Sequence, residues 1–462
     1  MLPPLLLLTL AVLAIILLSS VYKLNTFVVL LGVAVLVGLG AGIPGEQVLT
    51  HLRTGFGHTL EKVGLLIILG TMLGSFLDRT GATVTLANVI LRAVGERRTP
   101  LAVTLIGFLI GLPIFCDSGF IVLSGLVLTL AGRLGRFHLR LMLNLAGSLY
   151  TVHCLVPPHP GITAAVGILN ADLGQMMLLG TLLAVPGTLV SYVWGKYVDR
   201  TVGGRRSAPV VDGIGPVVLT GSPEIERTTG AKRPPTVRST AAAAAVLVPI
   251  GLIALKPILL LNAAAYPPTL LSVVRFIGDP VAALAVGIVI ALALFEKIDK
   301  AVVNGVFDDA IHKAGPVLAI VAAGGAFGEI IRHIGLDTTI TDWANRSAGG
   351  AGGVIPLWLP FLLTVVFKTA QGSSTVAVMS VSAIVLPLLP ALGVQTDFDK
   401  LLVLGAMGAG SMSVSHANDA YFWVVSRFGQ IDTPPMVRAY SPMTLVMGMA
   451  TFGVLWLLGI FV

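Results

Sequence analysis

The sequence contains little charge. Asp, Glu, Lys and Arg make up only 11% of its 462 residues, whereas 55% are hydrophobic. A soluble protein of this length could not cover its surface with so few charged residues, so the composition indicates a membrane protein. Cysteine is also scarce. The two cysteines, Cys116 and Cys154, exclude a framework of several disulfides, and they form no Cys/His spacing typical of a zinc site.

Motifs of enzymes are absent as well. The chain has no His-Glu-x-x-His motif, no Gly-x-Ser-x-Gly motif and no Gly-x-x-x-x-Gly-Lys-Ser/Thr loop for ATP. We therefore expect that the chain is neither an enzyme nor an ATP-driven pump. We also expect that it has no catalytic residues and binds no metal or cofactor. An intramembrane hydrolase or metalloenzyme remains the alternative from another class, because it too would explain intramembrane His and Asp residues. A channel would need a continuous polar stripe along its spans, whereas the polar residues here gather at a few interruptions.

Apolar runs that can span a membrane recur along the chain. About 20 residues of helix cross a hydrocarbon core of about 30 Å. The first run has no Lys or Arg before it and no small-residue cleavage site, so we expect a retained span rather than a signal peptide. The runs lie at 2–21, 24–43, 63–77, 176–195, 241–261, 276–295, 316–331 and 442–462.

Four further apolar segments are interrupted in the middle by polar residues, Gly or Pro. In two of them each arm is too short for an ordinary span, and we expect re-entrant helical hairpins. The other two are expected to be discontinuous transmembrane helices. The hairpins lie at 101–132 and 354–392, broken at 115–119 and 368–375, and the discontinuous helices at 139–169 and 401–425, broken at 156–161 and 416–419.

The two halves of the chain resemble each other faintly. Lys62 and His153 match Lys313 and His416 at a nearly constant spacing, as expected of one ancestral unit present twice. The segment 199–238, rich in Gly, Pro, Arg and Ser, is the natural linker between the halves.

The distribution of Lys and Arg predicts the orientation of the spans. The net charge of +7 would suggest a nucleic-acid partner in a soluble protein. Here the basic residues lie in the connections between apolar runs, and placing the linker in the cytoplasm puts most of them on that side, as the positive-inside rule requires. The halves are then separated by an odd number of crossings and are inverted. We expect the lipid bilayer, and no nucleic acid, as a partner.

The predicted fold is therefore an all-α polytopic membrane protein with two inverted repeats. Each repeat contains a re-entrant hairpin and a discontinuous helix. Residues 1–198 form the N-terminal repeat with two leading spans, 199–238 the cytoplasmic linker, and 239–462 the C-terminal inverted repeat.

The four interruptions are predicted to meet at one polar site near the middle of the membrane. Irregular backbone is tolerated within lipid only where protein or water satisfies its polar groups. Half-helices that begin after a break direct free N–H groups and a positive dipole end at the site, which favours an anion. Gly119, Gly161 and Gly372 would let the backbone approach a ligand closely. The pattern favours a secondary carrier.

Charged residues at the breaks are the first functional candidates. Asp117 lies in an otherwise apolar run, where an isolated carboxylate costs about 2.5 to 3.5 kcal/mol, so it is our first candidate for carrying a coupling proton. Asp419 is a similar candidate, and each of the two could instead cap a half-helix. Lys368 would meet the carboxylate of a substrate, or else pair with an Asp or extend to the interface.

Neutral side chains at the breaks suit a polyhydroxylated ligand. They could equally cap helix ends without any ligand. Three histidines are further candidates, although intramembrane histidines are often structural. The full set of candidate substrate-binding residues is Ser118, Gly119, His153, His159, Lys368, Gln371, Gly372, Ser373, Ser374, His416 and Asn418.

Five stretches of the chain resemble the gluconate permease family of bacterial proton symporters. The resemblance covers nearly the whole chain in the same order, and the Val-Pro-Pro-His-Pro-Gly and Ala-Gln-Gly-Ser segments carry it most specifically. The stretches lie at 70–74, 111–120, 153–161, 370–377 and 410–419.

This resemblance implies uptake of gluconate or a related sugar acid with a proton, in the bacterial cytoplasmic (inner) membrane. It also implies a place in the ion transporter superfamily, whose members use paired hairpins and an elevator-like motion. Lys368 stands where Arg is common in the family. Arg binds a carboxylate through two parallel hydrogen bonds and Lys through one point charge, so a different hydroxy acid is an option.

The nearest rival is a sodium-coupled carboxylate carrier, because Ser, Asn and carbonyl oxygens at the same breaks could hold Na⁺. The expected partner is a small-molecule sugar acid, the expected coupling ion is H⁺, and the sequence is compatible with a homodimer.

Overall fold

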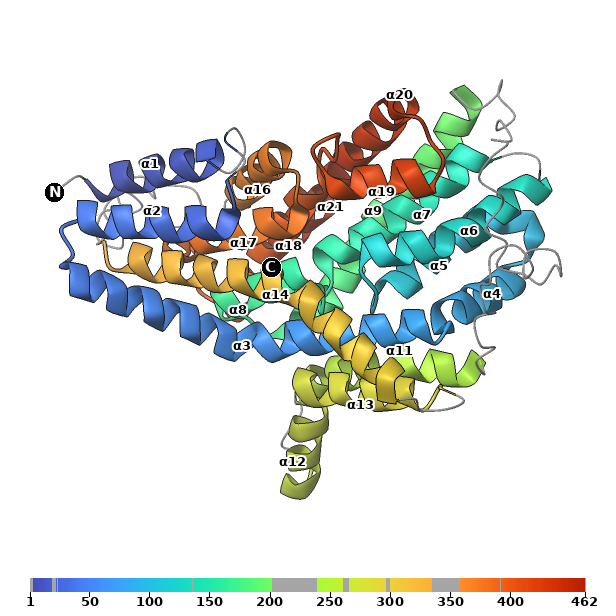
Figure 1. Cartoon of the computed structure of the whole chain (residues 1–462), viewed down its shortest axis with the longest axis horizontal. Coiled ribbons are helices and arrows are strands. Elements are labelled where there is room, and N and C mark those ends of the chain that lie inside the picture. The colour runs from blue at the N-terminus through green and yellow to red at the C-terminus, as the bar shows by residue number, and fades with distance from the viewer. Residues whose placement is uncertain are drawn as a thin grey trace.

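The computed structural model describes residues 3–18, 22, 24–134, 137–201, 239–260, 266–295, 300–334, 357–390 and 392–461. Within these residues every regular element is a helix (Figure 1). The predicted linker lies outside them from residue 202 onward, and α9 runs slightly past the predicted domain boundary, to Thr201.

The helices of the N-terminal half are α1 (Pro4–Ile16), α2 (Thr26–Gly40), α3 (Gly45–Arg79), α4 (Ala82–Val94), η2 (Glu96–Arg98), α5 (Thr99–Gly111), α6 (Cys116–Leu134), α7 (His138–Leu155), α8 (Pro160–Leu169) and α9 (Leu173–Thr201). Those of the C-terminal half are α11 (Ser239–Leu260), α12 (Pro268–Ile277), α13 (Pro280–Leu292), α14 (Lys300–Arg332), α16 (Trp358–Gln371), α17 (Ser374–Val385), η5 (Leu386–Leu388), α18 (Asp397–Met412), α19 (Ala420–Phe428), α20 (Thr433–Pro435), η6 (Met436–Tyr440) and α21 (Ser441–Phe461).

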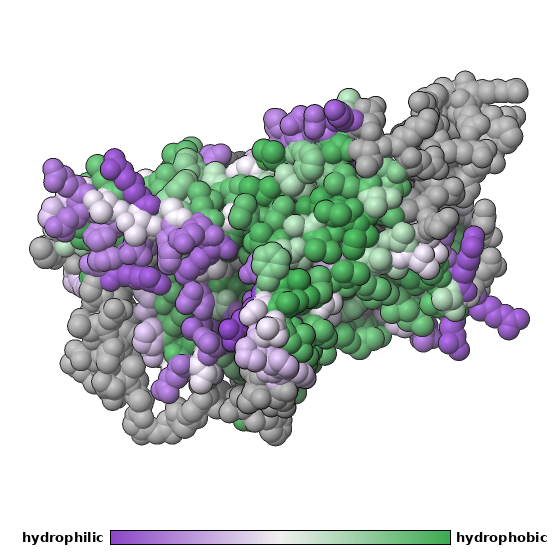
Figure 2. Space-filling model, turned by 90° about the horizontal axis from the view of Figure 1, so that it is seen from below, coloured by the Kyte–Doolittle hydropathy of each residue, from purple (hydrophilic) through white to green (hydrophobic). Residues whose placement is uncertain are grey.

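Several of these helices can cross a membrane. By length and composition six helical stretches qualify among the described residues, or seven if the bent pair α12 and α13 counts as one span. One of the six combines α7 with α8, and another combines α20, η6 and α21. Figure 2 shows a broad apolar surface across the middle of one face, with hydrophilic residues gathered toward its ends. A continuous apolar band of this kind is the surface that lipid covers. The chain is thus a multi-pass membrane protein.

Each of the four interrupted segments is divided into two helices. Three breaks overlap the predicted positions, but the first lies at 112–115 rather than 115–119, because α6 already begins at Cys116 and contains Asp117 in its first turn. The first hairpin becomes α5 and α6 and the second α16 and α17, while the discontinuous helices become α7 with α8 and α18 with α19. Pro160 occupies the first position of α8, where its missing N–H costs nothing. Asp419 accepts a hydrogen bond from the backbone of Tyr421 and so begins α19. Whether the hairpins are re-entrant in a bilayer stays a prediction.

The predicted continuous run at 276–295 is wrong in detail. The structure divides this region into α12 and α13, which meet at an angle of 65°. Gly278 follows the end of α12, and the Asp279 side chain accepts a hydrogen bond from Val281 N at 2.9 Å, with Pro280 at the first helical position. A Gly at the end of one helix, followed by Asp and Pro at the start of the next, is a typical boundary between two helices. The high hydropathy of the run hides this boundary in a sequence-based prediction.

Corresponding helices of the two halves pack against each other in opposite directions. In α3 and α14, a Cβ at Gly55 would lie 2.9 Å from Ala326 Cα, while the Phe76 ring lies 5.2 Å from that of Phe307. Residue numbers thus rise along one helix as they fall along the other (Figure 1). Small residues permit this close approach, as is common between membrane helices.

Two other matched pairs behave in the same way. In α7 and α18, Tyr150 lies beside Ser411 and Leu155 beside Gly408. In α9 and α21, Gly187 lies beside Thr451, and the Trp194 indole donates to Ala439 O, just before α21 begins. Inverted halves require such antiparallel pairs, and the repeat relation itself stays a prediction.

Candidate functional site

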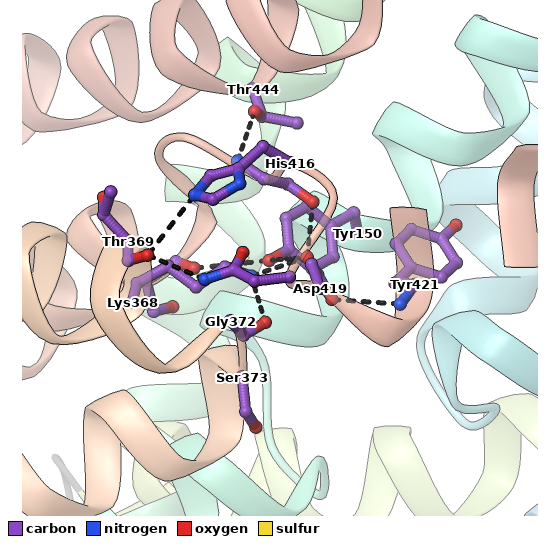
Figure 3. A network of polar contacts seen from close by, with 12 residues as sticks. Tyr150, Lys368, Thr369, Gly372, Ser373, His416, Asp419, Tyr421 and Thr444 are labelled. Atoms are coloured by element: carbon purple, nitrogen blue, oxygen red, sulfur yellow. Dashed lines mark hydrogen bonds and ion pairs between the residues drawn. The ribbon is translucent and has the colours of Figure 1, made fainter. Parts of the chain in front are cut away.

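A buried ion pair joins the breaks of the second half. Lys368 Nζ lies 2.5 Å from Asp419 Oδ2, and the two side chains are 0% and 7% exposed. Lys368 comes from the last turn of α16, and Asp419 precedes α19. Lys368 Nζ also donates to Gly372 O at 2.6 Å. The lysine therefore ties its own hairpin to the neighbouring discontinuous helix (Figure 3).

The Asp419 carboxylate is surrounded by further donors. Oδ1 accepts from Tyr421 N at 2.9 Å, while Oδ2 accepts from the hydroxyl of Ser415 and, at 3.4 Å, from that of Tyr150. The capping role considered for Asp419 is thus present in the structure. These donors stabilise the ionised carboxylate at a place where an unpaired charge would be costly.

Tyr150 brings the first half of the chain into this network. Its hydroxyl reaches Ser411 O at 3.4 Å, Lys368 Nζ lies 5.7 Å from its ring centroid, and its ring stacks on that of Tyr421 at 5.2 Å. Tyr421 in turn donates to Ala146 O at 3.1 Å. The ion pair thus sits between α7 and the two breaks of the second half.

Gly372 fits against the backbone of the other break. It has a φ of 82°, and an added Cβ would lie 2.6 Å from the carbonyl carbon of Asn418. Asn418 Nδ2 donates to Thr369 O at 2.7 Å and His416 Nε2 lies 3.3 Å from the same oxygen. Glycine is required here for both the left-handed conformation and the close approach.

The breaks of the two halves also touch. A Cβ at Gly161 would lie 2.9 Å from Thr375 Cα, so the start of α8 packs against the first turn of α17. Ser374 at the start of α17 and Ser411 of α18 both lie close to the Cys154 thiol of α7. One break of each half is therefore in contact with the other, whereas a single site shared by all four breaks stays a prediction.

Asp117 differs from Asp419 in its surroundings. It lies in the first turn of α6 and is exposed, and no hydrogen bond or ion pair joins its carboxylate to a residue that the structure describes. It is nevertheless close enough to Asp419 and Lys368 to interact with both charges. Ser118 beside it is half-buried, whereas Gly119 is buried against Leu149. Asp117 is thus an accessible carboxylate next to a buried ion pair.

Two of the candidate histidines form a separate cluster on the first half. The rings of His153 and His159 lie 4.9 Å apart, and Phe115 lies 6.3 Å and 5.9 Å from them. His159 is buried, and its Nε2 lies 2.7 Å from Gly111 O, which ties the break between α7 and α8 to the first hairpin. His153 is half-buried, and its Nδ1 has no partner among the described residues.

The remaining candidates lie along the second hairpin. The Ser373 hydroxyl accepts from Val376 N at 3.3 Å and caps α17, and Figure 3 shows it pointing away from Asp419. Gln371 is half-buried at the end of α16, and Asn418 opposite is exposed. The structure thus brings Lys368, Asp419, Gly372, His416 and Asn418 together, with Asp117 nearby, and leaves Ser373 in a capping position.

Sequence reasoning missed three residues of the network: Tyr150, Ser415 and Tyr421. All three are buried and contact Asp419. Tyr150 lies one helical turn before His153 and Cys154, a spacing that places residues on one face, so this spacing could have indicated it. Ser415 belongs to the stretch 410–419 but carries no distinguishing pattern of its own.

One group of described residues could hold a metal ion. His51, Glu329 and His333 have ligand atoms within 4.8 Å of one another. They lie near the start of α3, in the last turn of α14 and directly after α14. The two imidazole rings stack at 3.7 Å with planes 26° apart, so their nitrogen lone pairs run side by side rather than toward one ion. Glu329 also pairs with Arg332 at 3.5 Å. This group is separate from the breaks.

The charges in this arrangement favour the binding of an anion together with a proton. Lys368 and the two aspartates carry a net charge of −1, so an added anion would meet repulsion unless a carboxylate takes up a proton. An anion that bound Lys368 would share its ammonium with Asp419 and Gly372 O, which already accept two of its three N–H groups.

Comparison with known proteins gives one family over almost the whole chain. The family model described as GntP family permease matches residues 3–461. The chain is 31% identical to the gluconate permease of Pseudomonas aeruginosa, over 94% of this chain and 93% of that protein.

Relatives with other names are found at similar distance. The high-affinity gluconate transporter of Escherichia coli is 29% identical, over 95% of each chain. The Gnt-II system L-idonate transporter of the same organism is 28% identical, over 98% of each chain.

Two solved structures share the fold at low sequence identity. The YdaH transporter of Alcanivorax borkumensis superposes with a TM-score of 0.63 and 17% identity, over 90% of this chain and 89% of that one. MtrF of Neisseria gonorrhoeae, described with a class of antimetabolite efflux pumps, gives a TM-score of 0.63 and 15% identity, over 89% and 84%. At these identities the likeness concerns the fold.

Proposed function

The chain belongs to the GntP family of permeases, and on this premise we propose that it imports gluconate or a closely related sugar acid together with a proton. Its relatives carry the names of gluconate and L-idonate carriers. Both compounds have one carboxylate and a chain of hydroxyl groups, so a site that serves either must bind one negative charge and several hydroxyls.

The observation that carries the proposal is the buried pair of Lys368 and Asp419, with Asp117 accessible beside it. In the empty site Asp419 neutralises the lysine. When a proton reaches Asp419 the attraction between the two weakens, and Lys368 becomes available to the substrate carboxylate. Without the proton, the substrate would add an uncompensated charge to a site where burying one costs several kcal/mol.

Asp117 is the proposed entry point of the proton. Its carboxylate is accessible, whereas Asp419 is enclosed by donors from three elements. We assign the substrate hydroxyls to Asn418, Gln371 and Ser118, because their side chains are exposed or half-buried at the edge of the pair. Amide and hydroxyl groups both donate and accept hydrogen bonds, as a polyol requires.

The experiment that tests this function is uptake of labelled gluconate into proteoliposomes, with an inward pH gradient and an inward Na⁺ gradient imposed separately. We expect accumulation with the pH gradient alone. Asp419→Asn should abolish accumulation, since it removes the titratable group beside Lys368. Asp432→Asn is the matched control, because Asp432 is an exposed aspartate outside the network, and it should transport normally.

Other outcomes would redirect the proposal. Accumulation driven by Na⁺ and not by protons would replace it with sodium-coupled carboxylate transport. Uptake of L-idonate or another hydroxy acid, without uptake of gluconate, would keep proton coupling and change the substrate.

A further inference from the structure

A cavity lined by arginines lies far from the breaks, where α5 and α7 begin. Its volume is about 310 Å³, and its walls include Arg97, Arg98, Arg140, Phe137 and Tyr192. It lies at the opposite end of α5 and α7 from the Lys368 site. For the 13 residues of α5 this is a separation of about 20 Å at 1.5 Å per residue. The cavity is therefore a second site.

The cavity collects positive charge from helix ends as well as side chains. Arg98 precedes α5 and Phe137 precedes α7, and neither helix start has a side-chain cap. Asn144 Nδ2 donates to Pro100 O at 3.1 Å and holds the two helix starts together. The positive dipole ends of the two helices thus face the same region, which favours an anion.

Arg140 is held in place and keeps unused hydrogen-bonding capacity. Its side chain is 11% exposed, and its guanidinium lies 5.4 Å from the Phe137 ring and 5.6 Å from the Tyr192 ring. A Cβ at Gly195 of α9 would lie 3.2 Å from Arg140 Cγ, so the arginine stem packs directly on that helix. The buried Nε has no partner among the described residues. Arg140 Nη1 lies 3.9 Å from Asp199 Oδ2, which is a long ion pair.

We propose that this cavity binds a phosphate group. A guanidinium fixed between two aromatic rings can offer its N–H groups to paired oxygens, the geometry that phosphate matches. Arg97 and Arg98 are exposed and complete the charge. The distribution of Lys and Arg places this end of the molecule in the cytoplasm, where anionic lipids face basic pockets between transmembrane helices. The phosphate could belong to an anionic phospholipid headgroup or be free in the cytoplasm.

The test is thermal unfolding of the purified full-length protein in detergent, titrated in two arms. One arm adds phosphatidylglycerol, with phosphatidylcholine as the reference, and the other adds inorganic phosphate at constant ionic strength. We expect a saturable rise in the unfolding midpoint. A rise with phosphatidylglycerol alone assigns the headgroup, and a rise with inorganic phosphate as well assigns a free phosphate. No saturable rise in either arm overturns the proposal.

Paired variants show whether this cavity is responsible. Arg97→Gln with Arg98→Gln should raise the half-saturating concentration about tenfold or more, since each charge-assisted contact is worth about a factor of ten or more. The control is Arg79→Gln with Arg92→Gln, which removes two exposed arginines, at the end of α3 and in the last turn of α4, that do not line the cavity. It should leave the half-saturating concentration unchanged, and equal weakening in both variants would overturn the proposal. Unchanged elution in gel filtration confirms that each variant is folded.

Discussion

At the scale of single residues, the site depends on how one lysine is neutralised. Lys368 is fully buried, and Asp419 with its donors compensates its charge. A buried pair of this kind adds little stability compared with apolar residues of similar volume at the same positions. Removing one partner, however, leaves the other as an uncompensated buried charge. Such a pair is suited to a switch, because a proton or a substrate anion changes its balance.

The pairing of Lys368 with Asp419 predicts how stable the single and the double variants of these two residues are. Lys368→Met should destabilise the protein by about 3 to 5 kcal/mol, because it leaves Asp419 buried and uncompensated. Adding Asp419→Asn to it should recover much of this loss, since neither side chain then carries a charge. Thermal unfolding in detergent measures both variants. Equal stability of the single variant and the unaltered protein would contradict the buried pair.

Replacing Asp117 should abolish transport without affecting folding. Asp117→Asn should reach the membrane in normal amount and unfold at nearly the same temperature, because its carboxylate makes no hydrogen bond or ion pair with the described residues. Accumulation of gluconate driven by a pH gradient should be lost. Uphill uptake retained in this variant would remove Asp117 from the mechanism, and Asp432→Asn again serves as the control.

At the scale of elements, the broken helices position the charged residues. A continuous helix through 368–385 would satisfy its own backbone and expose no free N–H groups at the break. The turn at Gly372 stops α16, directs Gly372 O to Lys368, and brings the break against Asn418. A single glycine thus determines the spacing of the two interruptions.

Gly372 can be compared with a glycine that shares only its conformation. Gly393 also has a positive φ, 73°, but an added Cβ would have no neighbour within 4 Å. Gly372→Ala and Gly393→Ala should each lose about 1 to 2 kcal/mol from the left-handed conformation. The alanine at 372 should in addition abolish transport, because it forces Asn418 away. Uptake by both variants tests this, and normal uptake by Gly372→Ala would contradict the close approach.

At the scale of the whole molecule, the chain is a multi-pass protein of the bacterial inner membrane. Its matched helices α3 and α14, α7 and α18, and α9 and α21 pack side by side in opposite directions. The network around Asp419 draws on both halves, since Tyr150 belongs to the first and Lys368 to the second. A relative movement of the halves would therefore change the site directly.

The charge of the whole transport cycle gives a further prediction. The charge of one proton cancels that of one sugar-acid anion, so the loaded site has the same net charge as the empty site. Uptake should therefore be electroneutral, and an inside-negative potassium diffusion potential should neither drive nor inhibit it. The initial rate in proteoliposomes with valinomycin measures this. A rate that rises with the potential would show that more than one positive charge accompanies each anion.

The sequence by itself determined the membrane location, the helical architecture and the existence of the four breaks, although it placed the first one about three residues too late. These follow from local properties: apolar runs must lie in lipid, and Gly, Pro and polar clusters interrupt a helix within a few residues of themselves. It also identified Asp117, Lys368 and Asp419 as the charges at those breaks, because any charge in an apolar run is conspicuous. The division between α12 and α13 was missed because the hydropathy of about 20 residues was considered together, so that the three residues Gly-Asp-Pro hardly lowered its mean.

Only the tertiary structure decided how these residues are paired. Lys368 could have met a substrate or either aspartate, and its choice of Asp419, 51 residues away, depends on how α16 and α18 pack. The packing of helices also brings Tyr150 and Tyr421 into the site. The sequence could not indicate this, because an aromatic residue in an apolar helix cannot be distinguished from an ordinary core residue. Distance along the chain says nothing about such contacts, which the packing of whole helices determines.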